Sequence, residues 1–419
     1  MPRSIPDTKS VGPWRQGIDN VAPQTALGKE SLREAVNVEL LDSGWVRRRP
    51  GYVKRYTGTD VHSLHSTGAT TVFADGSSLL RLRPDYTTDT IRSDLTAGEE
   101  LSYAVTHRGT YYSNSSQTGW FNSTDASPYW TCPTPAAPTI STVPGALPAG
   151  SYALSLTAYD SVLGESAAVP LQSFSSDGEQ GVSVSVTSSS LPQYVYMTRA
   201  NGTALYQVAT VPAGDTSVVV ANAAGGYGVE LSTLDLEPLP AGNIVRSYRG
   251  QLWVATGSTL AVSRPMRPGL YDPAEDVFFF PEPITVLEPV DDGLYVVADR
   301  TYFLSGPTSS DMKLTGLDGD RGVPGTGSVQ PSKYFKLREA QAFVAHWFSE
   351  RGPVIGLNGG QLINYAEGRL AMEPYQAGSS AFIERNGVQQ LVTAVRSPGK
   401  DAALRATDSV VVEVRRHDA

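Results

Sequence analysis

Four carboxylates close together in the sequence are the residues best suited to catalysis: Glu282, Glu288, Asp291 and Asp292. Two suitably spaced carboxyl groups can serve as the acid and the nucleophile of a glycoside hydrolase. Asp291 and Asp292 also precede Gly293, and Asp-Gly is common turn chemistry in a hairpin. The cluster therefore supports two hypotheses, glycan cleavage and a structural turn.

Metal and cofactor sites are not predicted. His62 and His65 are three residues apart on a predicted strand, so they point to opposite faces and do not readily share a metal. The sequence 318–320, Asp-Gly-Asp, lacks the further ligands of a calcium loop, and 325–327, Gly-Thr-Gly, lacks the Lys-Ser/Thr of a phosphate loop. The single cysteine, Cys132, excludes an intrachain disulfide framework and a thiolate cluster. The other histidines are scattered: His107, His346 and His417.

A repeat indicates the elements that would position these side chains. Residues 252–265, LWVATGSTLAVSRP, align with residues 294–307, LYVVADRTYFLSGP, at an offset of 42. In each copy, apolar β-forming residues flank a short polar turn, which predicts strand, turn, strand. A period of about 40–45 residues built from short strands is typical of a β-propeller blade.

A third copy indicates an interruption in the repeat. Residues 71–84 align with 252–265 at an offset of 181, and 103–113 form a weaker copy between them. This offset is too long for two blades but fits two blades plus an insert of about 100 residues. Proline-rich boundaries occur at 132–138, CPTPAAP, and at 236–240, LEPLP. We therefore predict an inserted domain.

The composition changes inside this insert. Residues 133–232 carry seven charged side chains, of which only Arg199 is basic. Apolar and polar residues alternate along 152–158, which predicts a sandwich of antiparallel strands. Residues 150–160, followed by Gly-Glu-Ser at 164–166, resemble a strand and loop of fibronectin type III-like modules, and another small β-sandwich is the alternative.

The predicted fold is all-β: a β-propeller of five to seven blades with an inserted immunoglobulin/fibronectin III-like β-sandwich. The expected parts are an N-terminal arm with a propeller-closing strand (1–60), the first part of the propeller (61–132), the inserted sandwich (133–240) and the second part of the propeller (241–419). Residues 45–46 and 52–53 are candidates for the closing strand, which would pair with the last blade and remove its exposed edge. A stack of sandwiches is the alternative, and the 42-residue period disfavours it.

Charge and hydropathy restrict the functional classes. The formal net charge of −9 argues against attraction of nucleic acid over the whole surface. No apolar run approaches the length of a membrane span, and the N-terminus lacks the apolar core of a signal peptide. We therefore expect a chain that is made and folded in a cytoplasm and has no membrane segment.

Two segments carry a family resemblance. The first comprises Gly-Ile-Asp-Asn at 17–20, Leu-Arg-Glu-Ala-Val-Asn-Val-Glu at 32–39 and Gly-Trp-Val-Arg-Arg-Arg-Pro-Gly-Tyr at 44–52. The second comprises 252–268, followed by Asp-Val-Phe-Phe-Phe-Pro at 276–281 and Ile-Thr at 284–285. Together they resemble tail nozzle proteins of short-tailed bacteriophages, also called tubular tail or packaged-DNA stabilisation proteins.

The resemblance implies a structural virion protein rather than an enzyme, with no catalytic, cofactor-binding or metal-binding residue. It implies a homo-hexameric ring below the portal and its adaptor, contacts with tail fibres, and a channel through which phage double-stranded DNA passes without sequence-specific binding. The protein would retain and then release the packaged genome, and it would be located in the virion tail after assembly in the host bacterial cytoplasm. The acidic balance suits such a channel, because a DNA channel should repel phosphate rather than hold it. The chain is more compact than larger members of the family, which leaves a tail-tip position open.

Arg47, Arg48 and Arg49 are possible contacts to DNA or to a neighbouring subunit. The alternative interpretation is a strand whose alternation exposes Arg47 and Arg49 and pairs them with nearby acids.

Two other functions are alternatives to the nozzle. One is a receptor- or glycan-binding propeller at a tail tip, with sugars stacking on the aromatic pairs at 111–112, 120–121 and 129–130, although a blade core explains most of these pairs better. The other is a glycan hydrolase that uses the carboxylates at 282–292. A sialidase-like propeller would also need an arginine triad and repeated Asp-box turns, which residues 113–120, SNSSQTGW, imitate poorly and only once.

Overall fold

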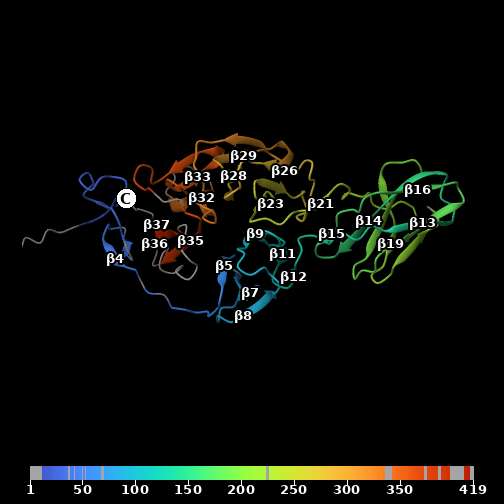
Figure 1. Cartoon of the computed structure of the whole chain (residues 1–419), viewed down its shortest axis with the longest axis horizontal. Coiled ribbons are helices and arrows are strands. Elements are labelled where there is room, and N and C mark those ends of the chain that lie inside the picture. Colours follow the sequence, from blue (N-terminus) through green and yellow to red (C-terminus); the bar gives the residue numbers. More distant parts are fainter. Residues whose placement is uncertain are drawn as a thin grey trace, which may run out of the picture. The chain divides into compact units, whose positions relative to one another are not determined.

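The computed structural model describes residues 12–35, 38–41, 43–49, 51, 53–67, 70–222, 226–335, 342–371, 375–385, 388–396 and 410–415. These residues form β-strands and three short 3-10 helices, and none of them lies in an α-helix (Figure 1). The all-β prediction is therefore confirmed. The chain divides into two compact units, residues 58–279 and residues 1–57 with 280–419.

Three four-stranded antiparallel sheets belong to the unit of residues 58–279. The first contains β5 (Val61–Ser66), β6 (Thr71–Asp75), β7 (Ser78–Leu82) and β8 (Thr88–Arg92). The second contains β9 (Ser102–Thr106), β10 (Gly109–Ser113), β11 (Thr118–Phe121) and β12 (Ala126–Ser127). The third contains β22 (Ile244–Tyr248), β23 (Gln251–Thr256), β24 (Thr259–Val262) and β26 (Val277–Phe279), and β21 (Glu237–Pro238) pairs separately with β25 (Leu270–Tyr271).

The repeated sequence forms the same hairpin in two of these sheets. Asp75 pairs with Ser78 around Gly76, and Thr256 pairs with Thr259 around Gly257. Both glycines have a positive φ, 58° and 57°, which a two-residue hairpin turn requires and which glycine adopts without steric cost. The predicted strand–turn–strand unit is therefore present in these copies.

Neighbouring sheets of this unit share hydrophobic cores. Side chains of the first two sheets pack in one cluster, which includes Val72, Leu79, Tyr112 and Phe121. A second cluster joins the second and third sheets and includes Tyr111, Trp120, Trp130, Leu252 and Val254.

The strands between residues 139 and 220 form two further sheets, drawn from green to yellow-green in Figure 1. One contains β13 (Thr139–Pro144), β17 (Gln180–Ser185) and β20 (Ser217–Val220). The other contains β14 (Gly150–Asp160), β15 (Gly164–Glu165), β16 (Gln172–Ser176), β18 (Gln193–Thr198) and β19 (Leu205–Val211). Both sheets contribute to one buried core that contains Leu154, Leu156, Val182, Val184 and Val195. The alternation seen in the sequence thus places apolar side chains between two sheets.

The unit of residues 1–57 and 280–419 has two four-stranded antiparallel sheets and one with three strands. The first contains β27 (Val286–Pro289), β28 (Gly293–Val297), β29 (Thr301–Ser305) and β30 (Lys313–Gly316). The second contains β31 (Ser328–Pro331), β32 (Phe343–Ser349), β33 (Gly352–Gly356) and β34 (Leu362–Asn364). The three-stranded sheet contains β35 (Ala377–Arg385), β36 (Val388–Arg396) and β37 (Val410–Arg415). The 3-10 helices are η1 (Ser309–Asp311), η2 (Ser332–Phe335) and η3 (Asn358–Gly360). Tyr295, Phe303 and Trp347 pack in one core between the first two sheets.

Four short strands precede the first sheet of the chain. β1 (Gly17–Ile18) pairs in parallel with β2 (Ser31–Leu32), and β3 (Val38–Leu40) pairs with β4 (Val46–Arg48). The sequence put Val46 forward as part of a closing strand, but the structure pairs it with β3 rather than with the sheet of β35–β37. An ion pair between Glu39 and Arg47, which face each other across the two strands, stabilises this pairing. Tyr52, in the other candidate, lies outside the described residues.

Candidate functional site

The four predicted carboxylates make contacts within the protein. Glu282 forms an ion pair with Arg321 at 2.9 Å, with both side chains about half exposed. Glu288 is 1% exposed in β27 and lies so close to Gly327 that a Cβ there would be 2.4 Å from Glu288 Oε1. A side chain larger than hydrogen at position 327 would therefore displace this carboxylate.

Asp291 and Asp292 anchor the turn between β27 and β28 to other loops. Asp291 Oδ2 accepts hydrogen bonds from the Ala342 backbone N–H at 3.1 Å and from Asn358 Nδ2 at 3.4 Å. Asp292 Oδ2 accepts a hydrogen bond from the Gly359 N–H at 2.8 Å. These contacts fit the turn interpretation of the Asp-Asp-Gly sequence.

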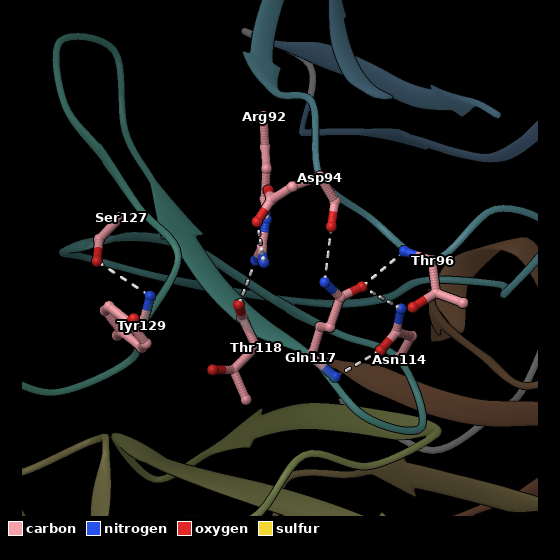
Figure 2. Close-up of polar contacts among 8 residues, drawn as sticks. All are labelled: Arg92, Asp94, Thr96, Asn114, Gln117, Thr118, Ser127 and Tyr129. Atoms are coloured by element: carbon pink, nitrogen blue, oxygen red, sulfur yellow. Dashed lines mark hydrogen bonds and ion pairs between the residues drawn. The ribbon is translucent and has the colours of Figure 1, made fainter. Parts of the chain in front are cut away.

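Residues 113–120, which the sequence compared with an Asp box, contain the end of β10, a turn at 114–117 and the start of β11 (Figure 2). Asn114 Oδ1 accepts hydrogen bonds from the N–H groups of Ser116 and Gln117, at 3.0 and 2.6 Å. The Asn114 N–H in turn donates to the Gln117 carbonyl. An uncharged amide thus closes this turn, as Asn side chains commonly do.

Gln117 joins the turn to the segment that follows β8 (Figure 2). Its Oε1 accepts a hydrogen bond from the Thr96 N–H at 2.7 Å, and its Nε2 donates to the Asp94 carbonyl at 2.8 Å. Arg92 adds a second link, donating to the Thr118 carbonyl at 2.7 Å while pairing with Asp94. The network fixes one sheet against the next.

Replacing Gln117 with leucine is expected to lower the free energy of unfolding by about 1 kcal/mol, because two backbone groups lose their partner. Urea unfolding followed by intrinsic fluorescence measures the change. Gln207→Leu is the matched control, since among the described residues its amide makes one hydrogen bond, to the Thr210 hydroxyl. Equal effects of the two substitutions would refute the structural role of Gln117.

The first segment of the family resemblance contains a side-chain clamp. The Asn20 carboxamide pairs with both backbone groups of Ala371: Nδ2 donates to the carbonyl and Oδ1 accepts from the N–H, each at 2.8 Å. The Asn20 N–H also donates to the Arg369 carbonyl. Asn20 therefore holds the N-terminal arm against residues 369–371 in the manner of a strand partner. Its neighbour in the motif, Asn37, lies outside the described residues.

The three predicted arginines occupy different environments. Arg47 donates to Glu39 Oε2 at 2.6 Å, which agrees with the pairing interpretation for this residue. Arg48 is exposed and Arg49 is half-buried. Within the described residues, neither Arg48 nor Arg49 takes part in an ion pair.

The second segment of the resemblance contains an arginine bound by three carboxylates. Arg264 contacts Asp272, Glu275 and Asp276, each at 2.9 Å. Asp276 is 2% exposed, and its burial raises the pKa of its carboxyl above the ordinary value, against the opposing effects of a backbone hydrogen bond and of Arg264. This arrangement, which we call the Arg264 hub, fixes the loop between β24 and β26.

A set of interacting polar side chains on β5 and β9, the first strands of two neighbouring sheets, was not predicted from the sequence. His65 of β5 stacks on Tyr103 of β9, with ring centroids 4.6 Å apart, and Tyr103 donates to the Ser63 carbonyl. Burial, and then the charge of Arg246, lower the pKa of His65. The strand is irregular between His62 and His65, and Ser63 has a φ of 54°, so simple alternation does not describe this stretch. The sequence carries no signal for this bulge.

The aromatic pairs proposed as sugar platforms are mostly core residues. Each of the following side chains is less than 5% exposed: Tyr111, Tyr112, Trp120, Phe121 and Trp130. Trp130 Nε1 also donates to the carbonyls of Tyr112 and Gly119. Tyr129, 52% exposed, is the member of this set that faces solvent.

In the part of the chain that the structure describes, no group of three or more His, Cys, Asp or Glu side chains has an arrangement suited to a metal ion. The described residues likewise contain no helix that is long and apolar enough to cross a membrane.

Comparison with known proteins gives neither a family nor a function. No protein-family model matches the chain. No curated protein matches it. Similar solved structures include BBS1N in complex with ARL6DN, at 10% identity and a TM-score of 0.34 over 88% of this chain and 97% of that one. They also include the AfRom2 CNH domain, at 8% identity and a TM-score of 0.27 over 85% and 94% of the two chains. A putative 6-phosphogluconolactonase from Bacteroides fragilis aligns at 12% identity with a TM-score of 0.29, over 84% of this chain and 92% of that one. At these TM-scores the similarities carry no argument about function.

Proposed function

We propose that this chain is a structural subunit of a bacteriophage tail, built on a β-propeller and assembled into a ring around the DNA exit channel. The two segments that resemble tail nozzle proteins carry the proposal. In the structure both are tied by side chains: Asn20 clamps the first to residues 369–371, and the Arg264 hub fixes the second. Residues that fix loops in this way suit a rigid assembly subunit.

The propeller part of the proposal is supported by the sheet topology. Six antiparallel sheets of three or four strands follow one another among the described residues outside the insert, and five of them have four strands. Within each unit, neighbouring sheets share hydrophobic clusters, as the faces of adjacent blades do. We infer six blades, within the five to seven that the repeat predicts. The two sheets of residues 139–220 would then be the inserted immunoglobulin/fibronectin III-like sandwich, interrupting the chain between the second and third blades.

A non-catalytic role is supported by the contacts of the predicted carboxylates. Asp291 and Asp292 bind backbone N–H groups, and Glu282 pairs with Arg321. Side chains used in this way are held by the fold instead of being directed at a substrate.

Immunogold electron microscopy of intact virions with an antibody against this chain tests the proposal. Label where the capsid meets the tail is the expected result for a nozzle ring. Label at the far end of the tail would instead favour the receptor-binding alternative. Virions without label would refute a role in the virion.

A further inference from the structure

A short basic segment of the N-terminal arm differs in charge from the rest of the chain. Residues 45–57, WVRRRPGYVKRYT, contain five cationic side chains and no carboxylate. Since the whole chain has a net charge of −9, the remaining residues together carry −14. Five positive charges are therefore concentrated in thirteen residues of an otherwise acidic protein.

The segment also exposes apolar side chains. Trp45 is 47% exposed and Val53 is 71% exposed. Arg48, which lies between them in the sequence, and Lys54, which follows Val53, are exposed as well. Residues 53–57 belong to no strand or helix. A segment that offers both cations and exposed apolar groups resembles the surface of a protein interface, where complementary charges select the partner and apolar groups become buried.

The insert has the opposite character. Between residues 133 and 232 there are six carboxylates and one cation. The cation, Arg199, lies over the rings of Tyr206 and Tyr227, at 5.4 and 5.0 Å from their centroids. Four of the carboxylates are exposed and form no ion pair within the described residues: Asp177, Glu179, Asp215 and Glu230. The negative charge of the insert is therefore largely uncompensated by its own chain.

We propose that residues 45–57 of one copy of this chain bind the acidic insert of a second copy, so that each subunit is held to the next by a basic arm on an acidic domain. Such a contact is heterologous and generates a ring when the rotation closes. The inference rests on the proposed ring and names the surfaces that build it. DNA is a less suitable partner for two reasons. The exposed apolar side chains of Trp45 and Val53 would not be buried favourably against charged phosphates, and the net charge of −9 on the chain repels the DNA backbone.

Sedimentation velocity of the full chain, at low and high salt, tests the contact. The test variant is Arg48→Glu with Lys54→Glu, and the control is Lys29→Glu with Lys313→Glu, an equal charge change at two other exposed lysines. We expect wild-type chains to associate, and less so at high salt, where screening weakens the charge attraction. The test variant is expected to associate about tenfold more weakly, since each reversed charge meets like charge. The control is expected to match wild type.

A charge swap makes the assignment specific to the insert. The Arg48→Glu/Lys54→Glu chain, mixed with an Asp177→Lys/Glu179→Lys chain, is expected to associate more tightly than either variant does alone. Unchanged association of the test variant, no gain in the mixture, or a wild-type chain that remains monomeric would each overturn the proposal. Fluorescent duplex DNA that binds wild type but not the test variant would overturn it in favour of a DNA contact. Virion labelling is independent of these results and decides the proposed function separately.

Discussion

Replacing Arg264 with methionine is expected to lower the free energy of unfolding by about 3 kcal/mol, because it removes the cation that faces a buried carboxylate. Asp276 is 2% exposed, so its charge cannot be solvated in place of the lost ion pair. Asp272 and Glu275, which contact the same guanidinium, would then repel Asp276 across the loop. This expected loss of stability is at the lower end of the range for a buried ion pair, because the Arg264 side chain is itself 28% exposed.

Urea unfolding measures this change, with Arg83→Met as the control in the same unit. Arg83 pairs with Asp89 at 2.7 Å, but both side chains are substantially exposed, so no measurable change in the urea midpoint is expected. A double variant, Arg264→Met with Asp276→Asn, isolates the cause, because asparagine keeps an oxygen for the Asp272 N–H but carries no charge. It removes both the cation and the buried charge, and is expected to recover much of the lost stability. If the double variant is no more stable than Arg264→Met alone, the buried charge is not the reason for the loss.

The parts of the fold that the sequence predicted depend on local chemistry. The hairpins at Gly76 and Gly257 follow from residues that are neighbours in the chain, and a repeated turn sequence produces a repeated turn. The alternation of apolar residues along 152–158 likewise predicts two sheets with a shared core, because side chains alternate across any strand.

The parts that could not be predicted depend on distant partners. Asn20 and Ala371 are 351 residues apart, and nothing near either residue indicates that they meet. Val46 reads as an edge strand by composition, but its composition does not indicate that its partner is β3, where Arg47 meets Glu39. The bulge at Ser63 is accompanied by contacts with Leu101, which precedes β9, and with Tyr103 in β9, and no local pattern encodes these contacts.

The carboxylates show the same limit for the candidate site. Sequence reasoning found that Glu282, Glu288, Asp291 and Asp292 are close in the chain, and it left a catalytic cluster and a turn open. The outcome depends on loops far along the chain, since Asp292 binds Gly359 and Glu282 binds Arg321. Proximity in the sequence therefore identified the four carboxylates as a group, but it did not show whether they are catalytic or structural.

The stability of the unit that contains β32 is expected to fall with decreasing pH because of His346. This side chain is fully buried, stacks beside Phe335 and meets Phe348 edge-on, and neither ring nitrogen has a hydrogen-bond partner within the described residues. Burial alone lowers the pKa of His346 from 6.5 to about 3. As the pH falls below 6.5, the unfolded chain takes up a proton that the folded chain does not bind. The stabilisation is thus complete above pH 6.5 and is lost on acidification at about 1.4 kcal/mol per pH unit, until the pH approaches 3.

His346→Leu removes this proton uptake and is expected to flatten the acid limb of the stability profile, measured by urea unfolding at a series of pH values. His65, whose pKa is also lowered, contributes with the same sign, so some slope will remain in the variant. His107→Leu is the matched control, because it deletes an exposed imidazole and is expected to leave the slope as in wild type. If His346→Leu and wild type lose stability in parallel between pH 6.5 and 4, the proton is taken up in the folded state. The imidazole would then have to reach solvent through an opening of the sheet between β31 and β33.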